Sequence, residues 1–311
     1  RHNLKIRKAL EHVYTNYKGD KTTDSWNAFE TYLKRVWFSN GIHHHYSNDK
    51  LKPEFSSDYL KELLAKTNAI LEGEAFDVVF NDADAKKVNQ AKGADNVALS
   101  AVNFYGPNVT NADVESFYKA KVSPNPEKPL SYGLNSQLVK ENGELKERVY
   151  KSGGLYGSAI DEITKWLELA KGVAENEAQG NALGLLIEYY KTGDLQTWDD
   201  YNVAWTAATT GNVDYINSFI EVYNDPLGYR GSYESIIQIN DFDMSQKMKV
   251  LSDNAQWFED NSPLMDAHKK KNVVGVTYKV VNIAGEAGDA SPSTPIGVNL
   301  PNANWIRAAV G

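Results

Sequence analysis

Cysteine is absent from the 311-residue sequence. This absence excludes disulfide frameworks, thiolate zinc sites, iron–sulfur clusters and cysteine nucleophiles within the chain. It does not decide the compartment, because a bacterial periplasmic protein can also lack cysteine. Long apolar runs are missing too. No stretch of 18 apolar residues occurs, so the sequence predicts no membrane-spanning helix.

Clustered positive charge is also missing. The chain carries 33 Lys and Arg against 41 Asp and Glu, a formal charge of −8, and its longest basic run is Lys269–Lys271. Phosphate backbones are bound by clustered Lys and Arg, so a nucleic-acid partner is disfavoured. The motifs G-x-G-x-x-G, P-loop, G-x-S-x-G and H-E-x-x-H do not occur. The only spacing of potential metal ligands that remains is a run of three histidines, considered below.

What the sequence does contain is helical periodicity. At about 150 residues per domain, the length suggests roughly two domains. Apolar residues recur at i, i+3 and i+4 through most of three regions, which predicts helices over 1–72, 158–222 and 243–260. A further helix is expected to begin at the Thr110-x-x-Asp113 capping pattern and to run through Tyr118.

Strand signals are fewer. The dipeptide Asn142-Gly143 is a hairpin turn signal and predicts a β-hairpin over 136–150. Prolines make 121–131 a loop, and the composition from 285 onward predicts an irregular tail. Shorter strands are expected at 77–80 and 273–281, and 97–104 is expected to form a strand or a strand plus turn. The expected class is α+β, a mainly helical lobe with a small antiparallel β-barrel or sheet.

Three consecutive histidines, His43, His44 and His45, are the most conspicuous local feature. Consecutive side chains point about 100° apart on a helix and to opposite faces on a strand. They therefore do not converge on one metal ion. We expect a loop in which one or two of these rings are hydrogen-bonded near a cleft.

A second feature is the stretch that carries Glu221 and Tyr223. The following Asp225-Pro226 and Gly228 force the chain into turns, so both side chains lie at the end of an element, where functional groups often project. A carboxylate there can hold an ammonium group, and a phenol can donate to a developing oxyanion. The plainer alternative is a helix C-terminus with solvated side chains.

A third feature is the segment 293–302. Its prolines and the two asparagines Asn299 and Asn302 suggest an extended segment with free backbone edges. Such a segment can pair with an extended peptide by strand addition, while side-chain amides bind peptide N–H and C=O groups. An ordinary Asn-rich loop is the alternative.

Three segments, taken together, resemble one family. They are Gly41–Tyr46, Glu221–Gly228 and Gly297–Asn302. Their order and spacing resemble the dipeptidyl peptidase III family of zinc exopeptidases, in particular its Bacteroidetes-like members. Further stretches, among them Asn254–Glu259 and Pro301–Arg307, extend the resemblance over essentially the whole chain.

The resemblance implies a substrate-binding lobe of a two-lobed metallopeptidase that binds oligopeptides in a cleft and releases dipeptides from their N-terminus. The family's zinc ligands come from an H-E-x-x-x-G-H helix and an E-E-x-x-[AR]-[RA] helix, and neither occurs here. Both follow the Asn-rich segment in family order, and both chain ends read as cuts. We therefore expect zinc in the full-length enzyme and none on residues of this chain. The missing C-terminal catalytic lobe would be its partner, and the chain alone would be inactive.

Site residues follow from the resemblance by position. Glu221 resembles the acid that binds the substrate α-ammonium, and Tyr223 resembles the catalytic tyrosine that hydrogen-bonds the scissile carbonyl oxygen. The remaining matches are an aromatic residue of the N-terminal pocket and three contacts to the peptide backbone: Tyr46, Ile296, Asn299 and Asn302.

The family's fold also implies a division of the chain. Residues 1–241 would form a lower lobe of helices and a five-stranded barrel, 242–281 an excursion into the upper lobe, and 282–311 a return that lines the cleft. A cytoplasmic location is implied, and a periplasmic one is compatible. Two alternatives stay open: a non-catalytic peptide-binding module and, more weakly, a Tyr-rich carbohydrate-active domain.

Overall fold

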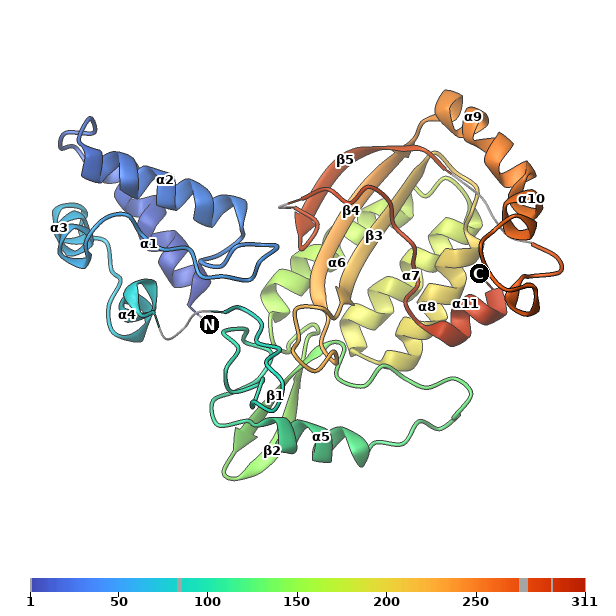
Figure 1. Cartoon of the computed structure of the whole chain (residues 1–311), viewed down its shortest axis with the longest axis horizontal. Coiled ribbons are helices and arrows are strands. Elements are labelled where there is room, and N and C mark those ends of the chain that lie inside the picture. Colours follow the sequence, from blue (N-terminus) through green and yellow to red (C-terminus); the bar gives the residue numbers. More distant parts are fainter. Residues whose placement is uncertain (1, 83–85, 274–278, 292, 311) are drawn as a thin grey trace. The chain divides into compact units, whose positions relative to one another are not determined.

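The computed structural model describes residues 2–82, 86–273, 279–291 and 293–310, and Figure 1 traces them. It confirms the α+β class, with helices in the majority and small antiparallel sheets. The chain divides into two compact units, which are described separately. The first unit comprises Arg1–Lys121, Gly133–Arg148 and Glu221–Ser232, and the second comprises Val122–Tyr132, Val149–Ile220 and Tyr233–Gly311.

The first unit begins with the expected helices. They are α1 (Asn3–Asn16), α2 (Asp24–Phe38) and α3 (Ser57–Thr67). Their apolar stripes bury one core, whose most enclosed members include Leu10, Trp26, Phe29, Leu33, Leu60 and Leu63. The helix α2 is capped by Thr23, whose side chain accepts the Trp26 N–H. The helix α3 ends at Thr67 with Asn68 left-handed, so the helical periodicity does not continue to residue 72 and Ile70 is 80% exposed.

Two strands expected in the first unit are wrong. Residues 77–80 belong to the helix α4 (Glu74–Phe80), which buries Ala75 and Val79 one turn apart. A seven-residue helix is too short for its period to be read from sequence. Residues 97–104 form turns, because the side chains of Asp95 and Asn111 accept backbone N–H groups of this segment in place of a strand ladder.

The predicted hairpin and the capped helix are confirmed. The hairpin pairs β1 (Ser136–Glu141) with β2 (Glu144–Val149). Both turn residues have positive φ, 52° at Asn142 and 85° at Gly143, as a type I′ turn requires. Thr110 and Asp113 form a reciprocal capping box at the start of α5 (Asn111–Lys119).

The second unit packs helices beside a sheet. The helix α7 (Glu177–Thr192) packs against both α6 (Gly157–Gly172) and α8 (Leu195–Ala207). The three-stranded sheet has the order β3 (Val213–Glu221), β4 (Ser232–Asn240), β5 (Val281–Gly288), with β5 drawn in red at its edge in Figure 1. Strands β4 and β5 are antiparallel, with Glu234 opposite Gly288. The Tyr190 hydroxyl donates to Asn217 Oδ1 at 2.7 Å and ties α7 to β3.

The strand β3 corrects the expectation of a helix up to residue 222. Its apolar residues fit helical spacing, and alternation is only partial, with Ile216, Ser218, Phe219 and Ile220 buried. A short apolar run of this kind cannot be assigned by periodicity alone. The β-branched residues and the pairing with β4, a strand that the sequence reading did not anticipate, decide for a strand.

The last third of the second unit is less regular than its predicted helix. Residues 243–260 form two helices, α9 (Phe242–Asp253) and α10 (Ala255–Asp260), because Asn254 between them leaves helical geometry. Most of the strand expected at 273–281 lies outside the described residues. The tail is more ordered than expected, since β5 runs to Gly288 and α11 (Asn304–Val310) packs against α8. A short 3-10 turn, η1 (Asp266–His268), precedes β5.

Three further expectations remain. Residues 121–131 form a loop, as predicted. In the part of the chain that the structure describes, the sheets have two and three strands and no closed barrel forms. No helix found among those residues has both the length and the apolar character that crossing a bilayer requires.

Candidate functional site

Glu221 and Tyr223 lie where β3 leaves the sheet, in the first unit. Glu221 is the last residue of the strand, and its side chain is half-buried. Tyr223 follows in a turn and is 59% exposed. The element that ends here is a strand, so the helix C-terminus considered as the plainer alternative is wrong. The Asp225 N–H donates to the Val222 carbonyl at 3.0 Å and closes the turn.

The carboxylate of Asp225 organises this turn from inside. It accepts the backbone N–H groups of Leu227 at 3.0 Å and of Tyr229 and Arg230 at 2.9 Å each. The Tyr105 hydroxyl donates to the same carboxylate at 2.8 Å. Asp225 is 3% exposed, so these bonds are shielded from water. Sequence reasoning treated Asp225 only as part of a turn signal, although an Asp before Pro is also a frequent turn-capping acceptor.

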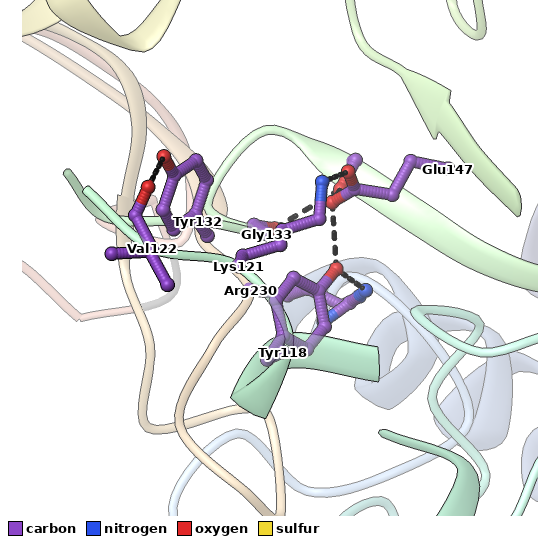
Figure 2. Close-up of polar contacts among 8 residues, drawn as sticks. Tyr118, Lys121, Val122, Tyr132, Gly133, Glu147 and Arg230 are labelled. Carbon is purple, nitrogen blue, oxygen red and sulfur yellow. Dashed lines mark hydrogen bonds and ion pairs between the residues drawn. The ribbon is translucent and has the colours of Figure 1, made fainter. Parts of the chain in front are cut away.

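Arg230 is fully buried beneath the same turn. Its guanidinium lies over the ring of Tyr105, 4.5 Å from the centroid, and over the ring of Tyr118 at 5.0 Å. One of its nitrogens donates to the Tyr118 hydroxyl, as Figure 2 shows. Burial lowers the pKa of Arg230, but the two tyrosine oxygens and Asp225 outweigh it and raise the pKa above its usual value. The guanidinium therefore stays charged. Sequence reasoning missed this residue, because a lone Arg in a turn gives no signal.

Glu147 on β2, which is partly buried, completes this group. It accepts the Tyr118 hydroxyl at 2.7 Å, the Ser136 hydroxyl at 2.8 Å and the Lys121 ammonium at 2.6 Å (Figure 2). Burial raises the pKa of Glu147, but the hydrogen bonds from Lys121, Tyr118 and Ser136 outweigh it and lower the pKa below its ordinary value. The carboxylate is thus ionised at neutral pH.

The three histidines lie in a loop of the first unit and have separate surroundings. His43 is buried and lines a cavity of about 330 Å³ with both polar and apolar walls. Burial, chiefly, lowers its pKa to about 4, with the chain terminus, Lys50 and Lys87 as lesser causes. His44 Nδ1 accepts the N–H of Tyr46 at 3.2 Å and so shapes the loop.

No metal site follows from these histidines. Over the described ranges, no group of three His, Cys, Asp or Glu side chains is placed to hold a metal ion. Tyr46, expected in an N-terminal pocket, is 73% exposed on the same loop.

The Asn-rich segment belongs to the second unit. Ile296, Asn299 and Asn302 are all exposed there. Arg307 on α11 donates to the backbone carbonyl of Asn299 at 2.9 Å and to that of Pro301 at 2.6 Å. The segment is thereby fixed to α11, and the asparagine side chains face outward. The structure thus groups Glu221 with Tyr223 in one unit and the two asparagines with Ile296 in the other.

Comparisons with known proteins agree on one family. The model of Peptidase family M49 matches residues 81–311. Dipeptidyl peptidase 3 of Dictyostelium discoideum is 24% identical over 308 residues, which is 93% of this chain and 43% of that protein. Dipeptidyl peptidase 3 of Nematostella vectensis is 27% identical over 176 residues, or 57% of this chain and 24% of that protein. The chain spans less than half the length of these curated relatives.

The fold comparison agrees. A solved structure of DPP III from Caldithrix abyssi covers 99% of this chain with 53% of its own, at a TM-score of 0.58 and 22% identity. That likeness concerns the fold, whereas the family model rests on the sequence of well over half of the chain. On that match, the chain belongs to peptidase family M49.

Proposed function

We propose that this chain is the substrate-binding part of a zinc exopeptidase that releases dipeptides from the N-terminus of oligopeptides. The observation that carries the proposal is the pair Glu221 and Tyr223 at the end of β3, on a turn held by the buried Asp225. A half-buried carboxylate and an exposed phenol, two residues apart, offer one group for an ammonium and one for a carbonyl oxygen. Membership of a peptidase family supports this assignment.

Glu221 would bind the free α-ammonium of the peptide. A charge-assisted hydrogen bond of this kind is worth about 1.5–3 kcal/mol. A fixed carboxylate would also set how many residues lie between the N-terminus and the scissile bond. Release of dipeptides then follows from geometry, without recognition of particular side chains.

Tyr223 would donate its hydroxyl proton to the scissile carbonyl oxygen. That hydrogen bond strengthens as negative charge develops on the oxygen, so it stabilises the transition state more than the ground state. Asn299 and Asn302 would bind the peptide backbone through their amides, with Ile296 contributing a backbone contact. Tyr46 would line the N-terminal pocket.

Zinc does not fit the donors that this chain offers. Its described part contains no suitable group of three ligands, and H-E-x-x-x-G-H is absent from the sequence. We place the zinc ligands in the remainder of a full-length protein and derive no step through the metal here. In the same proposal, 1–241 and 282–311 form the lower lobe, and 242–281 extends into the upper lobe. A cytoplasmic location follows from family analogy.

The proposal is tested on the full-length protein with a tetrapeptide and its N-acetylated form. The free peptide should release its N-terminal dipeptide, and the acetylated peptide, which has no ammonium group, should not be cleaved. Glu221→Gln should raise KM for the free peptide about 10- to 100-fold, the equivalent of the lost charge-assisted bond. Glu144→Gln, on an exposed carboxylate of the hairpin, is the matched control.

Two outcomes would contradict the proposal. One is equal cleavage of the acetylated and free peptides. The other is an unchanged KM in Glu221→Gln. Binding of the tetrapeptide without any dipeptide release would favour the non-catalytic peptide-binding module instead.

A further inference from the structure

The buried group beneath the Glu221–Tyr223 turn is a continuous chain of hydrogen bonds. Tyr105 donates its only hydroxyl proton to Asp225, and Tyr118 donates its own to Glu147. Each hydroxyl keeps lone pairs for the guanidinium of Arg230, at 3.5 Å in the case of Tyr105. Every hydrogen bond in this series therefore runs in the same donor-to-acceptor direction, from Arg230 outward to the two carboxylates.

The charges of this group balance. Arg230 and Lys121 carry one positive charge each, and Asp225 and Glu147 one negative charge each. A buried charge that loses its partner is strongly destabilising, whereas a fully paired group is tolerated. The balance therefore depends on all four side chains keeping their places, and it gives the turn one well-defined geometry.

This geometry reaches the candidate site through very few bonds. Asp225 lies two residues after Tyr223, and its N–H bonds the Val222 carbonyl at 3.0 Å. A displacement of the Asp225 carboxylate therefore moves the backbone on which Tyr223 stands. The opposite end of the chain of bonds rests on α5 and the hairpin, through Tyr118 and Glu147.

We propose that Asp225 and Arg230 are positioning residues, which hold Tyr223 at the scissile carbonyl through the turn 225–230. This inference rests on the proposed function of Tyr223. Arg230 acts through its planar fork, which reaches both tyrosine hydroxyls while lying against both rings. A lysine would keep the charge and lose the fork.

Gly133 lies next to the contact between Tyr118 and the guanidinium of Arg230. Its φ is +91°, and a Cβ built there would lie 3.0 Å from the Tyr118 ring and 3.1 Å from an Arg230 nitrogen. A side chain at position 133 would therefore crowd both Tyr118 and Arg230, and glycine leaves that space open.

The test is a double-mutant cycle in the full-length protein with a dipeptidyl-arylamide substrate. Arg230→Lys should lower kcat about 10- to 100-fold, since misplacing a reacting group by about 1 Å costs on this order. KM should change less than about threefold. In the Tyr223→Phe background, the same substitution should lower kcat less than about threefold, because the hydroxyl that it positions is gone. A variant that only reduces the folded fraction would lower kcat by the same factor in both backgrounds.

Tyr105→Phe is the milder second variant, in case Arg230→Lys fails to fold. It removes one hydroxyl between Asp225 and Arg230, and we expect a kcat loss of about threefold to tenfold that again shrinks in the Tyr223→Phe background. Tyr14→Phe is the control, because it removes a Tyr–Glu hydrogen bond between α1 and α2, to Glu30. It should leave kcat unchanged.

The outcomes separate the two proposals. Equal kcat losses in both backgrounds overturn the positioning role and leave the proposed function standing. A Tyr223→Phe enzyme with unchanged kcat overturns the proposed function, whatever the Arg230 variant does.

Discussion

At the residue scale, exposure distinguishes Tyr223 from the tyrosines that surround Arg230. Those two, Tyr105 and Tyr118, are buried, and burial raises the pKa of both phenols, so they stay protonated and serve as fixed donors. Tyr223 presents its ring to solvent at the end of a strand. A tyrosine with a reactive role must be reachable by substrate, and in this segment Tyr223 meets that requirement.

Tyr223→Phe should lower kcat of the full-length protein about 100-fold while KM changes less than about threefold. The reason is that loss of a donor to a developing oxyanion costs about 10²–10³ in kcat. Steady-state kinetics with a dipeptidyl-arylamide gives both constants. Tyr132→Phe is the control, since its hydroxyl donates to the Val122 carbonyl at 3.2 Å, away from the turn 225–230 (Figure 2). An unchanged kcat in Tyr223→Phe would remove this residue from the reaction.

At the element scale, the helix α8 contains a buried carboxyl group that destabilises the folded chain at neutral pH. Asp199 on this helix is buried, and its Oδ2 has no hydrogen-bond partner among the residues described. Burial, followed by the charges of Asp200 and Asp194, raises its pKa to about 7. An unfolded Asp titrates near 3.9. Between these two values the unfolded chain releases a proton that the folded chain keeps, so folding becomes less favourable as pH rises.

Asp199→Asn should therefore stabilise the chain at pH 8 by a few kcal/mol, about 4 at most, and have little effect at pH 4. The wild-type free energy of unfolding should fall between pH 4 and 7 more steeply than that of the variant. Urea denaturation at several pH values measures both. Asp200→Asn, on the exposed side of the same helix, should shift stability far less. Parallel pH curves for wild type and Asp199→Asn would contradict the assignment.

Elements also show where sequence reasoning succeeds and fails. The hairpin was predictable because Asn142-Gly143 has a specific backbone requirement, and the α5 start because Thr110 and Asp113 cap each other. The strand β3 was not predictable, since Ile216, Phe219 and Ile220 satisfy a helical stripe as well as a partner strand. Pairing with β4 decides between them, and pairing is a property of the folded chain.

The candidate site divides in the same way. Glu221 and Tyr223 were found because Asp-Pro and Gly mark the end of an element. Arg230 was not found, since its importance comes from contacts with Tyr105 and Tyr118, more than 100 positions earlier in the chain. A local pattern cannot report such a contact.

At the scale of the whole molecule, the chain spans only part of its relatives. Under the proposed function, this chain binds the substrate and the rest of a full-length protein supplies the zinc ligands. Purified alone, the 311-residue chain should bind less than about 0.1 zinc per molecule and hydrolyse no dipeptidyl-arylamide. Elemental analysis and an activity assay check both. One tightly bound zinc per chain would contradict the proposal that the zinc ligands lie outside this chain.

Metal removal extends this test. A chelator should abolish hydrolysis by the full-length protein and leave the thermal midpoint of the isolated chain unchanged, because a ligand stabilises only the state that binds it. Added zinc should restore the full-length activity. A chelator-induced fall in the midpoint of the isolated chain would mean that its own residues hold the metal.

The contacts of Arg307 bear on the range of peptide substrates that such an enzyme would accept. Its guanidinium takes up acceptor capacity on the carbonyls of Asn299 and Pro301, and Pro301 has no N–H to offer. A peptide lying along this segment would therefore meet mainly the carboxamides of Asn299 and Asn302. A carboxamide can hydrogen-bond to the main chain of any peptide, whatever side chains that peptide carries. Under the proposed function, a peptide would be chosen by its free end and its extended form, so unrelated sequences of similar length should be degraded at similar rates.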